Sequence, residues 1–440
     1  KNVKRCFFEL EKSQWLKNKE VINLQEKKLR QLINHAYHHV PYYRQVMDKK
    51  GIRPSDIKTI QDLQKLPLLS KKEINNNLYF DLFSDNHNKK KVKRITTSGS
   101  TGSPFICFVD RYQLEMRWAA TLRGHQMTGC NFADKQVRLW HQTIGLSFSQ
   151  RFKEKIDAFL SRRKFIPVFE LNINNIRAML KTIKNYKPKL VDGYAEAFNL
   201  IAQFMSDTKV DTVNVPSILS SAQYLPPETR SKIEEQLNSS VFDKYGSREF
   251  SGIAYECEQH NGLHIVAENY IVEILKNGKP VKPGELGEVV ITDLNNFCQP
   301  FVRYCIGDLA VAEDINKKCA CGRGLPLIKN IQGRVQSIIV GSNGRYIPGT
   351  FFSHLFKDYS YLVQQYKIEQ IIKDEINLSV VKGLRFESKK FDELLSQLYK
   401  YLGEDTKINC KYVEKINLTK VGKHQAVLSK LKLDFQSIKL

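Results

Sequence analysis

Residues 189–237, KLVDGYAEAFNLIAQFMSDTKVDTVNVPSILSSAQYLPPETRSKIEEQL, alternate short apolar runs with longer helical patterns. Two segments, 189–192 and 217–221, have the length and the apolar character of buried strands. The segments that follow them, 196–205 and 228–237, space apolar residues three or four positions apart, as amphipathic helices do. Strands that alternate with helices predict β-α-β units and a largely parallel sheet, so the fold class is α/β.

The pattern changes after residue 270, where YIVEIL and ELGEVVITDL flank the turn-rich stretch NGKPVKPG. This arrangement predicts two antiparallel strands within a β-rich subdomain at about residues 262–335. Glycines near residue 340 mark a boundary between an N-terminal domain, residues 1–335, and a small α+β domain, residues 336–440. In the latter we expect helices at 351–356 and 391–402 and a last strand near 408–413.

Two local signals stand out near the N-terminus. An amphipathic pattern at residues 24–33 continues to Pro41, where we expect the helix to stop and a turn to follow. Ser70 precedes Glu73 by three residues, which is the spacing of a capping box.

Basic residues dominate the charge of this 440-residue chain, which is 42% hydrophobic and long enough for two or three structural units. Its 69 Lys and Arg exceed its 46 Asp and Glu, which leaves a formal net charge of +23. This excess favours anions such as nucleotides, nucleic acid or an anionic membrane surface. The densest basic run, residues 89–94, is either a solvated loop or a surface that attracts a polyanion.

Targeting signals are absent from the sequence: no apolar run reaches the roughly eighteen residues of a membrane-spanning helix, and the first thirty residues hold no signal-peptide core. We therefore expect a cytoplasmic protein. Nine scattered cysteines are then expected to be reduced thiols rather than disulfides. The sequence leaves the oligomeric state open, a homodimer included.

The stretch TTSGSTGSPF, residues 96–105, gathers hydroxyls and glycines directly after the basic run. Such a segment offers backbone N–H groups and hydroxyl donors that can surround a phosphate chain, but flexible linkers share its composition. It lacks the spacing of a Walker loop and of a dinucleotide-binding glycine motif. Taken alone, it does not distinguish a phosphate-binding loop from a linker.

Five stretches in chain order resemble the signature elements of the adenylate-forming enzymes. They are TTSGSTGSP (96–104), YGSRE (245–249), RYCIGD (303–308), GRVQS (333–337) and LTKVGKHQAV (418–427). The first resembles the loop of that superfamily that contacts the pyrophosphate end of ATP. Their shared order favours the phosphate-binding interpretation of the loop.

The stretch LRQLINHAYHHVPYYRQVMDKKGIRPSDIKTIQDLQKLPLLSKKEI, residues 29–74, resembles the opening of the phenylacetate–CoA ligase branch and its CapK-like capsular relatives. The resemblance implies a large domain of mixed and parallel sheets flanked by helices, and a C-terminal domain that moves as a lid about a hinge. It also implies ATP-dependent activation of an aryl or small carboxylic acid as acyl-AMP, release of pyrophosphate, and transfer to coenzyme A. ATP, Mg²⁺ and coenzyme A are the expected cofactors and co-substrates.

Motif by motif, the resemblance implies roles for individual residues. Lys423 would contact the acyl carboxylate and the α-phosphate, Glu249 would hold Mg²⁺, and Arg334 would reach ribose and phosphate. Tyr245 would stack on adenine, and Asp308 would bind the ribose hydroxyls. The nucleotide-binding set as a whole is Thr97, Ser98, Gly99, Ser100, Thr101, Gly102, Ser221, Ala222, Gln223, Asp243, Tyr245, Gly246, Ser247, Asp308 and Arg334.

The acyl pocket is expected between the sheet and the helices that precede Tyr245, lined by Trp140, His141, Tyr194 and Ala222. Aromatic side chains there suit an aryl or small apolar acid. Trp140 and Tyr194 also fit a core position, and amino acids and hydroxy acids remain open as substrates.

Two cysteine pairings, Cys257-x-x-His260 and Cys319-x-Cys321, fall in or beside the β-rich subdomain. Three thiolates and one imidazole make a structural zinc site, and some members of this ligase branch have a zinc site at similar positions. His264 is a competing histidine, and the thiols of Cys298 and Cys305 compete with the other cysteines. Unmetallated thiols are the alternative interpretation.

Four positions depart from the family pattern. Ser103 stands where many members have lysine, Arg248 replaces the usual threonine of YGxTE, and Gln223 replaces a frequent glutamate. Gln336 stands at the hinge aspartate, which weakens the expectation that coenzyme A is the acceptor. One alternative transfers the acyl or aminoacyl group to an amine or hydroxyl of a sugar or metabolite. A second is non-catalytic binding of a nucleotide or nucleic acid, although no nucleic-acid-binding motif supports a nucleic-acid partner.

Overall fold

The structure is a computed structural model that describes residues 2–77, 81–97, 105–140, 156, 158–159, 161–167, 173–208, 213–334, 338–343, 346–348, 352, 355–356, 359, 361–416 and 426–431. The helices are α1 (Asn2–Ser13), α2 (Asn18–His39), α3 (Pro41–Lys49), α4 (Lys71–Asn77), α5 (Arg111–Met127), α7 (Ile173–Tyr186), α8 (Ala195–Thr208), α9 (Pro227–Leu237) and α11 (Ser388–Leu402). Short 3₁₀ helices cover Pro54–Asp56, Gln61–Lys65 and Lys89–Lys91.

The strands fall into one large sheet and smaller ones. The large sheet contains β3 (Gln136–Trp140), β4 (Arg163–Pro167), β5 (Leu190–Tyr194), β6 (Ser217–Ser221), β7 (Ser240–Ser247), β8 (Ser251–Glu256), β9 (Leu263–Ile265), β10 (Tyr270–Lys276), β11 (Lys279–Pro280), β12 (Leu286–Asp293), β13 (Tyr304–Ala312) and β14 (Leu327–Arg334). The others are β1 (Lys93–Thr97), β2 (Phe105–Val109), β15 (Ile338–Val340), β16 (Tyr346–Pro348), β17 (Val363–Gln370), β18 (Glu375–Lys382), β19 (Lys407–Tyr412) and β20 (Val427–Ser429).

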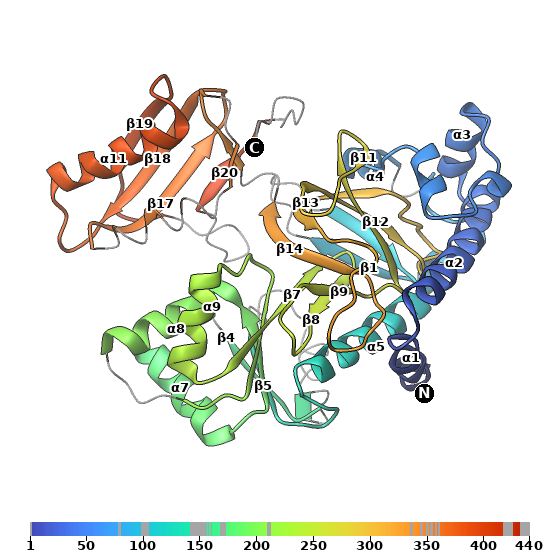
Figure 1. Ribbon diagram of the computed structural model, residues 1–440, viewed down its shortest axis with the longest axis horizontal. Coiled ribbons are helices and arrows are strands. Elements are labelled where there is room, and N and C mark those ends of the chain that lie inside the picture. Colours follow the sequence, from blue (N-terminus) through green and yellow to red (C-terminus); the bar gives the residue numbers. More distant parts are fainter. Residues whose placement is uncertain are drawn as a thin grey trace.

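One half of the large sheet is parallel, in the order β4-β3-β5-β6-β7. The helices α7, α8 and α9 lie against one face of it, where Ile176, Phe198 and Ile233 pack on strand residues such as Val191 and Ile218 (Figure 1). Burying one apolar helix face against the sheet is what stabilises such an arrangement. The α/β fold and the β-α-β units predicted for residues 189–237 are confirmed.

The other half is antiparallel and begins where β8 turns back along β7. The two strands predicted in residues 270–294 are β10 and β12, which pair antiparallel from Tyr270↔Asp293 to Leu275↔Glu288. A short strand, β11, pairs with β10 within the turn between them. This half of the sheet buries its apolar side chains against α1, α2 and α5 in one continuous core.

The N-terminal helices confirm one local prediction and correct another. Glu73 accepts a hydrogen bond from the Ser70 backbone at 2.7 Å and donates its own N–H to Ser70 Oγ at 3.2 Å, so the predicted capping box forms at α4. The predicted helix is part of α2 and ends before Pro41, but no turn follows. Instead Pro41 is the first residue of α3, a position that tolerates proline because its N–H would be unpaired there.

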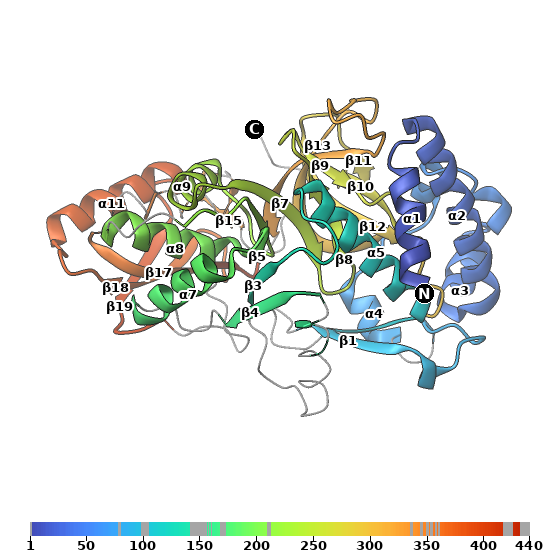
Figure 2. The same cartoon turned by 90° about the horizontal axis from the view of Figure 1, so that it is seen from below.

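The C-terminal unit has a sheet of its own, in the order β19-β18-β17-β20, with α11 packed on it. It lies at the opposite end of the molecule from α1–α3 in both ribbon views (Figures 1 and 2). The predicted helix at 391–402 is confirmed within α11, whereas residues 335–337, at the predicted domain boundary, lie outside the described residues. The strand expected near 408–413 is β19, but it is not the last, because β20 follows and pairs parallel to β17.

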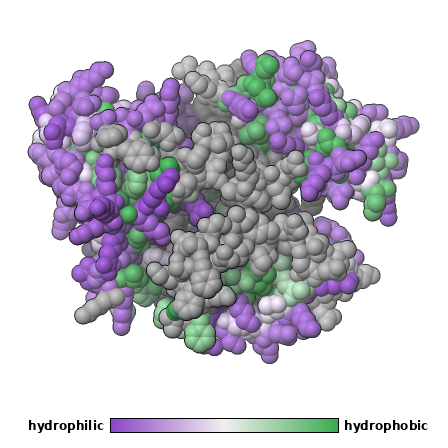
Figure 3. Space-filling view, turned by 180° about the vertical axis from the view of Figure 1, so that it is seen from behind, coloured by the Kyte–Doolittle hydropathy of each residue, from purple (hydrophilic) through white to green (hydrophobic). Residues whose placement is uncertain are grey.

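The outer surface is charged, as the composition suggests. On the face seen in Figure 3 the described residues are mainly hydrophilic, and hydrophobic ones form small scattered groups. Within the part of the chain that the structure describes, no helix combines the length and the apolar character needed to span a bilayer.

A buried ion pair joins the N-terminal helices to the large sheet. Arg123 of α5 contacts Glu268 through two short bonds, Nη1–Oε1 at 2.6 Å and Nη2–Oε2 at 3.0 Å. The side chains are only 1% and 3% exposed. Arg123 also donates to the Leu10 carbonyl at 3.0 Å, and Ser13 Oγ donates to Glu268, so the pair fixes α1 as well.

Replacing Arg123→Met should lower the free energy of unfolding by about 3–5 kcal/mol, because the buried Glu268 carboxylate would lose its partner. The matched control is Arg111→Met, whose ion pair with Glu115 has an arginine that is 84% exposed. It should change stability by less than about 1 kcal/mol. Thermal or denaturant unfolding of both variants measures the difference, and equal effects would contradict the structural role of Arg123.

Candidate active site

The predicted site residues gather at the carboxyl ends of the parallel strands. Tyr194 and Ser221 end β5 and β6 and are register partners, and Ser221 is also paired with Lys244 of β7. In open α/β sheets this edge is where ligands bind. Ala222, the next residue, has φ = 67°, a left-handed conformation that an alanine rarely adopts. Backbone of this kind persists where the surroundings impose it, which happens often at functional sites.

Tyr245 and Asp308, predicted from different motifs, are in direct contact. The Tyr245 hydroxyl at the end of β7 donates to Asp308 Oδ2 at 2.9 Å, and both residues are 7% exposed. Asp308 lies on β13, where its backbone register partner is Arg334 of β14. The structure therefore brings together three residues that are 89 positions apart from first to last, and so links the YGSRE, RYCIGD and GRVQS stretches.

Glu249, the predicted magnesium ligand, is 5% exposed and follows β7. The Tyr304 hydroxyl donates to its Oε1 at 3.4 Å, and Arg117 of α5 donates to its backbone carbonyl. A buried carboxylate oriented in this way can serve as an oxygen ligand for Mg²⁺. Sequence reasoning missed Arg117, because an arginine in a helix is most often exposed, and only its 7% exposure here reveals its role.

Asp243, two residues before Tyr245, lies beside a second acidic residue. Its backbone N–H donates to Glu256 Oε2 at 2.7 Å, and Arg230 binds the Glu256 carboxylate with bonds of 3.0 and 2.8 Å. Burial and the negative charge of Glu256 raise the pKa of Asp243 from 3.8 to about 7. The sequence did not indicate that Asp243 lies beside Glu256, since Glu256 and Arg230 lie outside the five motifs.

The aromatic residues predicted for the acyl pocket also meet. Trp140, at the end of β3, stacks on Tyr194, at the end of β5, with ring centroids 4.2 Å apart and planes at 14°. The Arg138 guanidinium lies 4.5 Å from the Trp140 ring centre. Stacked rings of this kind form a flat apolar wall.

Several predicted residues lie outside the described part of the chain. They are Ser98, Gly99, Ser100, Thr101, Gly102, His141 and Lys423, together with the departures Ser103 and Gln336. For Thr97 and Arg334 the structure gives the strand but not the side chain. Gly246 and Ser247 complete β7, and Ser247 Oγ accepts a hydrogen bond from the Phe250 backbone at 3.3 Å.

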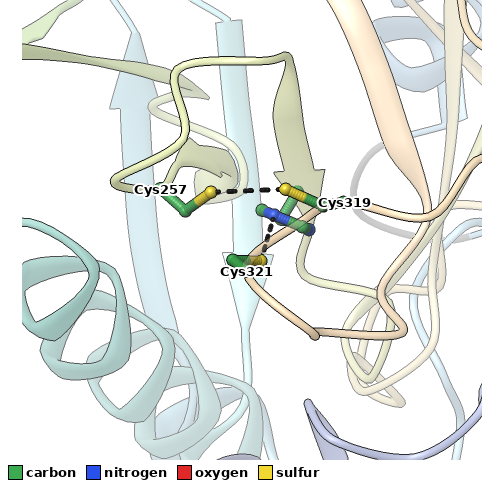
Figure 4. Close-up of side chains that lie close together, drawn as sticks. Cys257, Cys319 and Cys321 are labelled. Carbon is green, nitrogen blue, oxygen red and sulfur yellow. Dashed lines mark hydrogen bonds between the residues drawn. The ribbon is translucent and has the colours of Figure 1, made fainter.

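Three thiols and one imidazole cluster at β9. Cys257, His264, Cys319 and Cys321 place their ligand atoms within 4.8 Å of one another. Figure 4 shows the three thiols pointing toward a common centre, with Cys257 Sγ 3.6 Å from Cys319 Sγ. His264 Nε2 lies 3.3 Å from Cys321 Sγ. The donor set and its burial fit a structural Zn²⁺ ion, and burial lowers the pKa of His264 to about 4, which keeps the imidazole neutral as a metal ligand must be.

The histidine of this cluster is not the predicted one. His260 lies in a tight turn with φ = 48°, and its Nδ1 is 3.2 Å from Arg230 Nη1 and 3.4 Å from Glu256. Its ring packs against Phe242 instead. His264 is held by β9, opposite Leu327 of β14, which turns it toward the Cys319–Cys321 segment. The competing thiols Cys298 and Cys305 do not belong to the four-residue cluster.

Known proteins share both the fold and the sequence pattern. A family model described as the CapK C-terminal domain matches residues 339–430. A phenylacetate-coenzyme A ligase of Aromatoleum evansii is 23% identical over 431 residues, which cover 93% of this chain and 94% of that protein. The protein CapK of Staphylococcus aureus is 22% identical over 437 residues, covering 94% and 90%. The chain is therefore similar over most of its length to phenylacetate-coenzyme A ligases and to the protein CapK, in line with the resemblance that its motifs suggest.

A solved structure of the adenylate-forming superfamily has the same architecture. A 2-hydroxyisobutyryl-CoA ligase in the postadenylation state superposes with a TM-score of 0.72 at 19% identity, covering 96% of this chain and 92% of that chain. The likeness confirms the predicted fold: a large domain of mixed sheet flanked by helices and a separate small α+β unit.

The raised pKa of Asp243 predicts a pH-dependent stability. The unfolded carboxyl ionises near pH 3.8 and the folded one near pH 7, so the folded state holds the extra proton between these values. Stability contributed at low pH is therefore lost as the pH rises from about 4 to about 7. Asp243→Asn removes this dependence. The free energy of unfolding of the variant minus that of the wild type should therefore be a few kcal/mol larger at pH 8 than at pH 4.

Unfolding curves of the wild type and Asp243→Asn at pH 4, 6 and 8 measure this difference. Asp405→Asn, at an exposed position of the C-terminal unit, is the control and should run parallel to the wild type. A constant difference between Asp243→Asn and the wild type at all three pH values would show that folding does not raise the pKa of Asp243.

We propose that the Cys257, His264, Cys319 and Cys321 cluster binds zinc, and the two histidines provide a matched test. Protein purified without chelator should contain near-stoichiometric zinc by elemental analysis. His264→Asn should lose most of it, because one of four ligands is removed, whereas His260→Asn should keep it. Wild-type protein without zinc, or zinc loss in His260→Asn alone, would refute the assignment.

Proposed function

We propose that this protein activates a carboxylic acid with ATP, forming an acyl-adenylate and pyrophosphate, and then transfers the acyl group to coenzyme A. Similarity to a phenylacetate-coenzyme A ligase and to a 2-hydroxyisobutyryl-CoA ligase supports the reaction class, an AMP-forming acid ligase. The observation that carries the proposal is the contact between Tyr245 and Asp308, because it unites the predicted adenine and ribose residues at the edge where ligands bind.

The chemistry demands charge neutralisation more than acid–base catalysis. In the first step a carboxylate oxygen of the acid attacks the α-phosphorus of ATP, and the bond to the β-phosphate oxygen breaks to release pyrophosphate. In the second step the sulfur of coenzyme A attacks the acyl carbon and AMP leaves. Negative charge accumulates on phosphate oxygens throughout, so positioned cations and hydrogen-bond donors lower the barrier.

The described residues suit that task. Asp308 and Tyr245 form a buried pair in which the Asp308 carboxylate can accept a hydrogen bond from a ribose hydroxyl and the Tyr245 ring can stack on the base. Glu249, fixed through its carbonyl by Arg117, would hold the Mg²⁺ ion, which neutralises phosphate charge when bound. We assign the pyrophosphate contacts to residues 97–102 and the carboxylate contact to Lys423 as proposals that rest on the family pattern.

The C-terminal unit, residues 336–440, is proposed as a lid over this edge of the sheet. Such a unit would bring Lys423 to the site for the first step and move away for the second. Coenzyme A is the proposed acceptor, since several of the similar proteins are phenylacetate-coenzyme A ligases. An amine or hydroxyl acceptor is the second candidate, favoured by Gln336 at the expected hinge aspartate.

Carboxylate-dependent exchange of labelled pyrophosphate into ATP tests the first step without any acceptor. We expect exchange with at least one acid in a panel of aryl, aliphatic, amino and hydroxy acids. Absence of pyrophosphate exchange with every acid of the panel would refute the proposal. Adding coenzyme A, or an amine, to the active acid and identifying the product then settles the acceptor.

Asp308→Asn should lower kcat/KM for ATP about ten- to hundred-fold in the exchange assay, the loss of a hydrogen bond to a charged group. The effect should lie mainly in the KM for ATP, because the ribose does not react. Asp314→Asn, six residues later on an exposed turn, is the matched control and should leave exchange unchanged. An Asp308→Asn enzyme with wild-type KM for ATP would remove Asp308 from the nucleotide site.

A further inference from the structure

A buried charged group lies on the strands that lead to the predicted acyl pocket. Arg138 of β3 and Asp192 of β5 are register partners in neighbouring parallel strands. Arg138 Nε is 3.2 Å from Asp192 Oδ2, and the side chains are 25% and 8% exposed. Interior strands of a parallel sheet are usually apolar throughout, so an aspartate here needs a reason.

Positive charge surrounds this aspartate from several elements. Lys244 of β7 and Arg163 of β4 face Asp192 in addition to Arg138, and His125 of α5 lies on the same side. Burial opposes ionisation of Asp192, but the cations outweigh it and lower the pKa of this carboxyl below its usual value. Burial also lowers the pKa of His125 to about 4, so the imidazole is neutral. The group thus holds three cations, one anion and one neutral imidazole.

Within the described residues, Asp192, His125 and Arg138 each have one side-chain atom without a hydrogen-bond partner. These atoms are Asp192 Oδ1, His125 Nε2 and Arg138 Nε, and Asp192 and His125 are only 6% and 7% exposed. Leaving a buried polar atom unpaired is costly, and native proteins rarely do so without a functional cause. An acceptor and a ring nitrogen that can donate or accept are therefore available to a bound polar group.

The position of the group connects it to the acid rather than to the nucleotide. Arg138 and Asp192 each precede a pocket residue by two positions on the same strand, Trp140 and Tyr194 respectively. The Arg138 guanidinium packs on Trp140, which stacks on Tyr194. Since two strand residues span about 7 Å, Asp192 lies about 7 Å along β5 from Tyr194.

We propose that Asp192 and His125 bind a hydroxyl group at the end of the acid substrate remote from its carboxylate. This inference rests on the proposed adenylation and names the substrate class: a hydroxylated aryl or alkyl carboxylic acid. A hydroxyl donates to Asp192 Oδ1 and accepts from His125 Nε2 in the tautomer that protonates this nitrogen. An ammonium group is disfavoured by the three nearby cations. A second carboxylate is attracted by those cations but has no proton to donate to Asp192 Oδ1, so that oxygen would stay unpaired.

Selectivity follows from the cost of unpaired groups. A site that hydrogen-bonds a substrate hydroxyl rejects the analogue lacking it strongly, because the buried polar atoms then stay unpaired. We expect a ratio of kcat/KM between hydroxylated and unsubstituted acid of at least about 100. An apolar pocket would instead discriminate between the two only weakly.

Pyrophosphate exchange by the wild-type protein measures this ratio on matched acids, for example phenylacetate and its para-hydroxy, para-amino and para-carboxy derivatives, with an alkyl series alongside. The hydroxylated acid should be the best substrate of its series. Preference for the unsubstituted, amino or carboxy member would overturn the inference while leaving adenylation intact. Absence of exchange with every acid would instead refute the proposed function itself.

Asp192→Asn then tests the residue. The ratio should fall at least ten-fold while the KM for ATP stays unchanged, because the nucleotide residues are not altered. Asp207→Asn, an exposed aspartate of α8, is the matched control and should keep the wild-type ratio. An unchanged ratio in folded Asp192→Asn would make the Arg138–Asp192 pair structural only. If that variant does not fold, the wild-type panel still decides.

Discussion

The hydrogen bond between the Tyr245 hydroxyl and the Asp308 carboxylate joins the two halves of the large sheet at the place where its character changes. Tyr245 lies near the end of β7, the last parallel strand, and Asp308 belongs to the antiparallel part. The carboxyl ends of the parallel strands lie at one edge of the sheet, and the antiparallel strands border that edge. The proposed adenine and ribose contacts depend on this junction, because Tyr245 and Asp308 come from different halves of the sheet.

Much of the fold was predictable because it follows from local periodicity. The segment 189–237 forms the expected strands and helices, since its apolar spacing leaves few other ways to bury the side chains. The turn expected after Pro41 was wrong, because a proline that ends one helix is also well suited to begin the next. Likewise β20 is too short, at three residues, to leave a periodic signal, and its pairing with β17 comes from tertiary packing.

The site was predictable only in part, for a different reason. Tyr245, Glu249 and Asp308 lie in motifs that can be recognised in the sequence. The residues that hold the site in place do not lie in such motifs. Arg117 and Arg230 act from helices that carry no motif, and their partners are far away in sequence. The exchange of His260 for His264 has a similar origin: spacing along the chain cannot show which way a turn directs a ring. Three-dimensional register decides such cases.

The pairing of the small C-terminal sheet has a mechanical consequence. The strand before residue 417 and the strand after residue 425, β19 and β20, belong to one four-stranded sheet. The described residues on either side of Lys423 therefore belong to one body. If this lysine contacts ATP as proposed, its approach requires a displacement of the entire C-terminal unit, so the first reaction step and the orientation of that unit would be coupled.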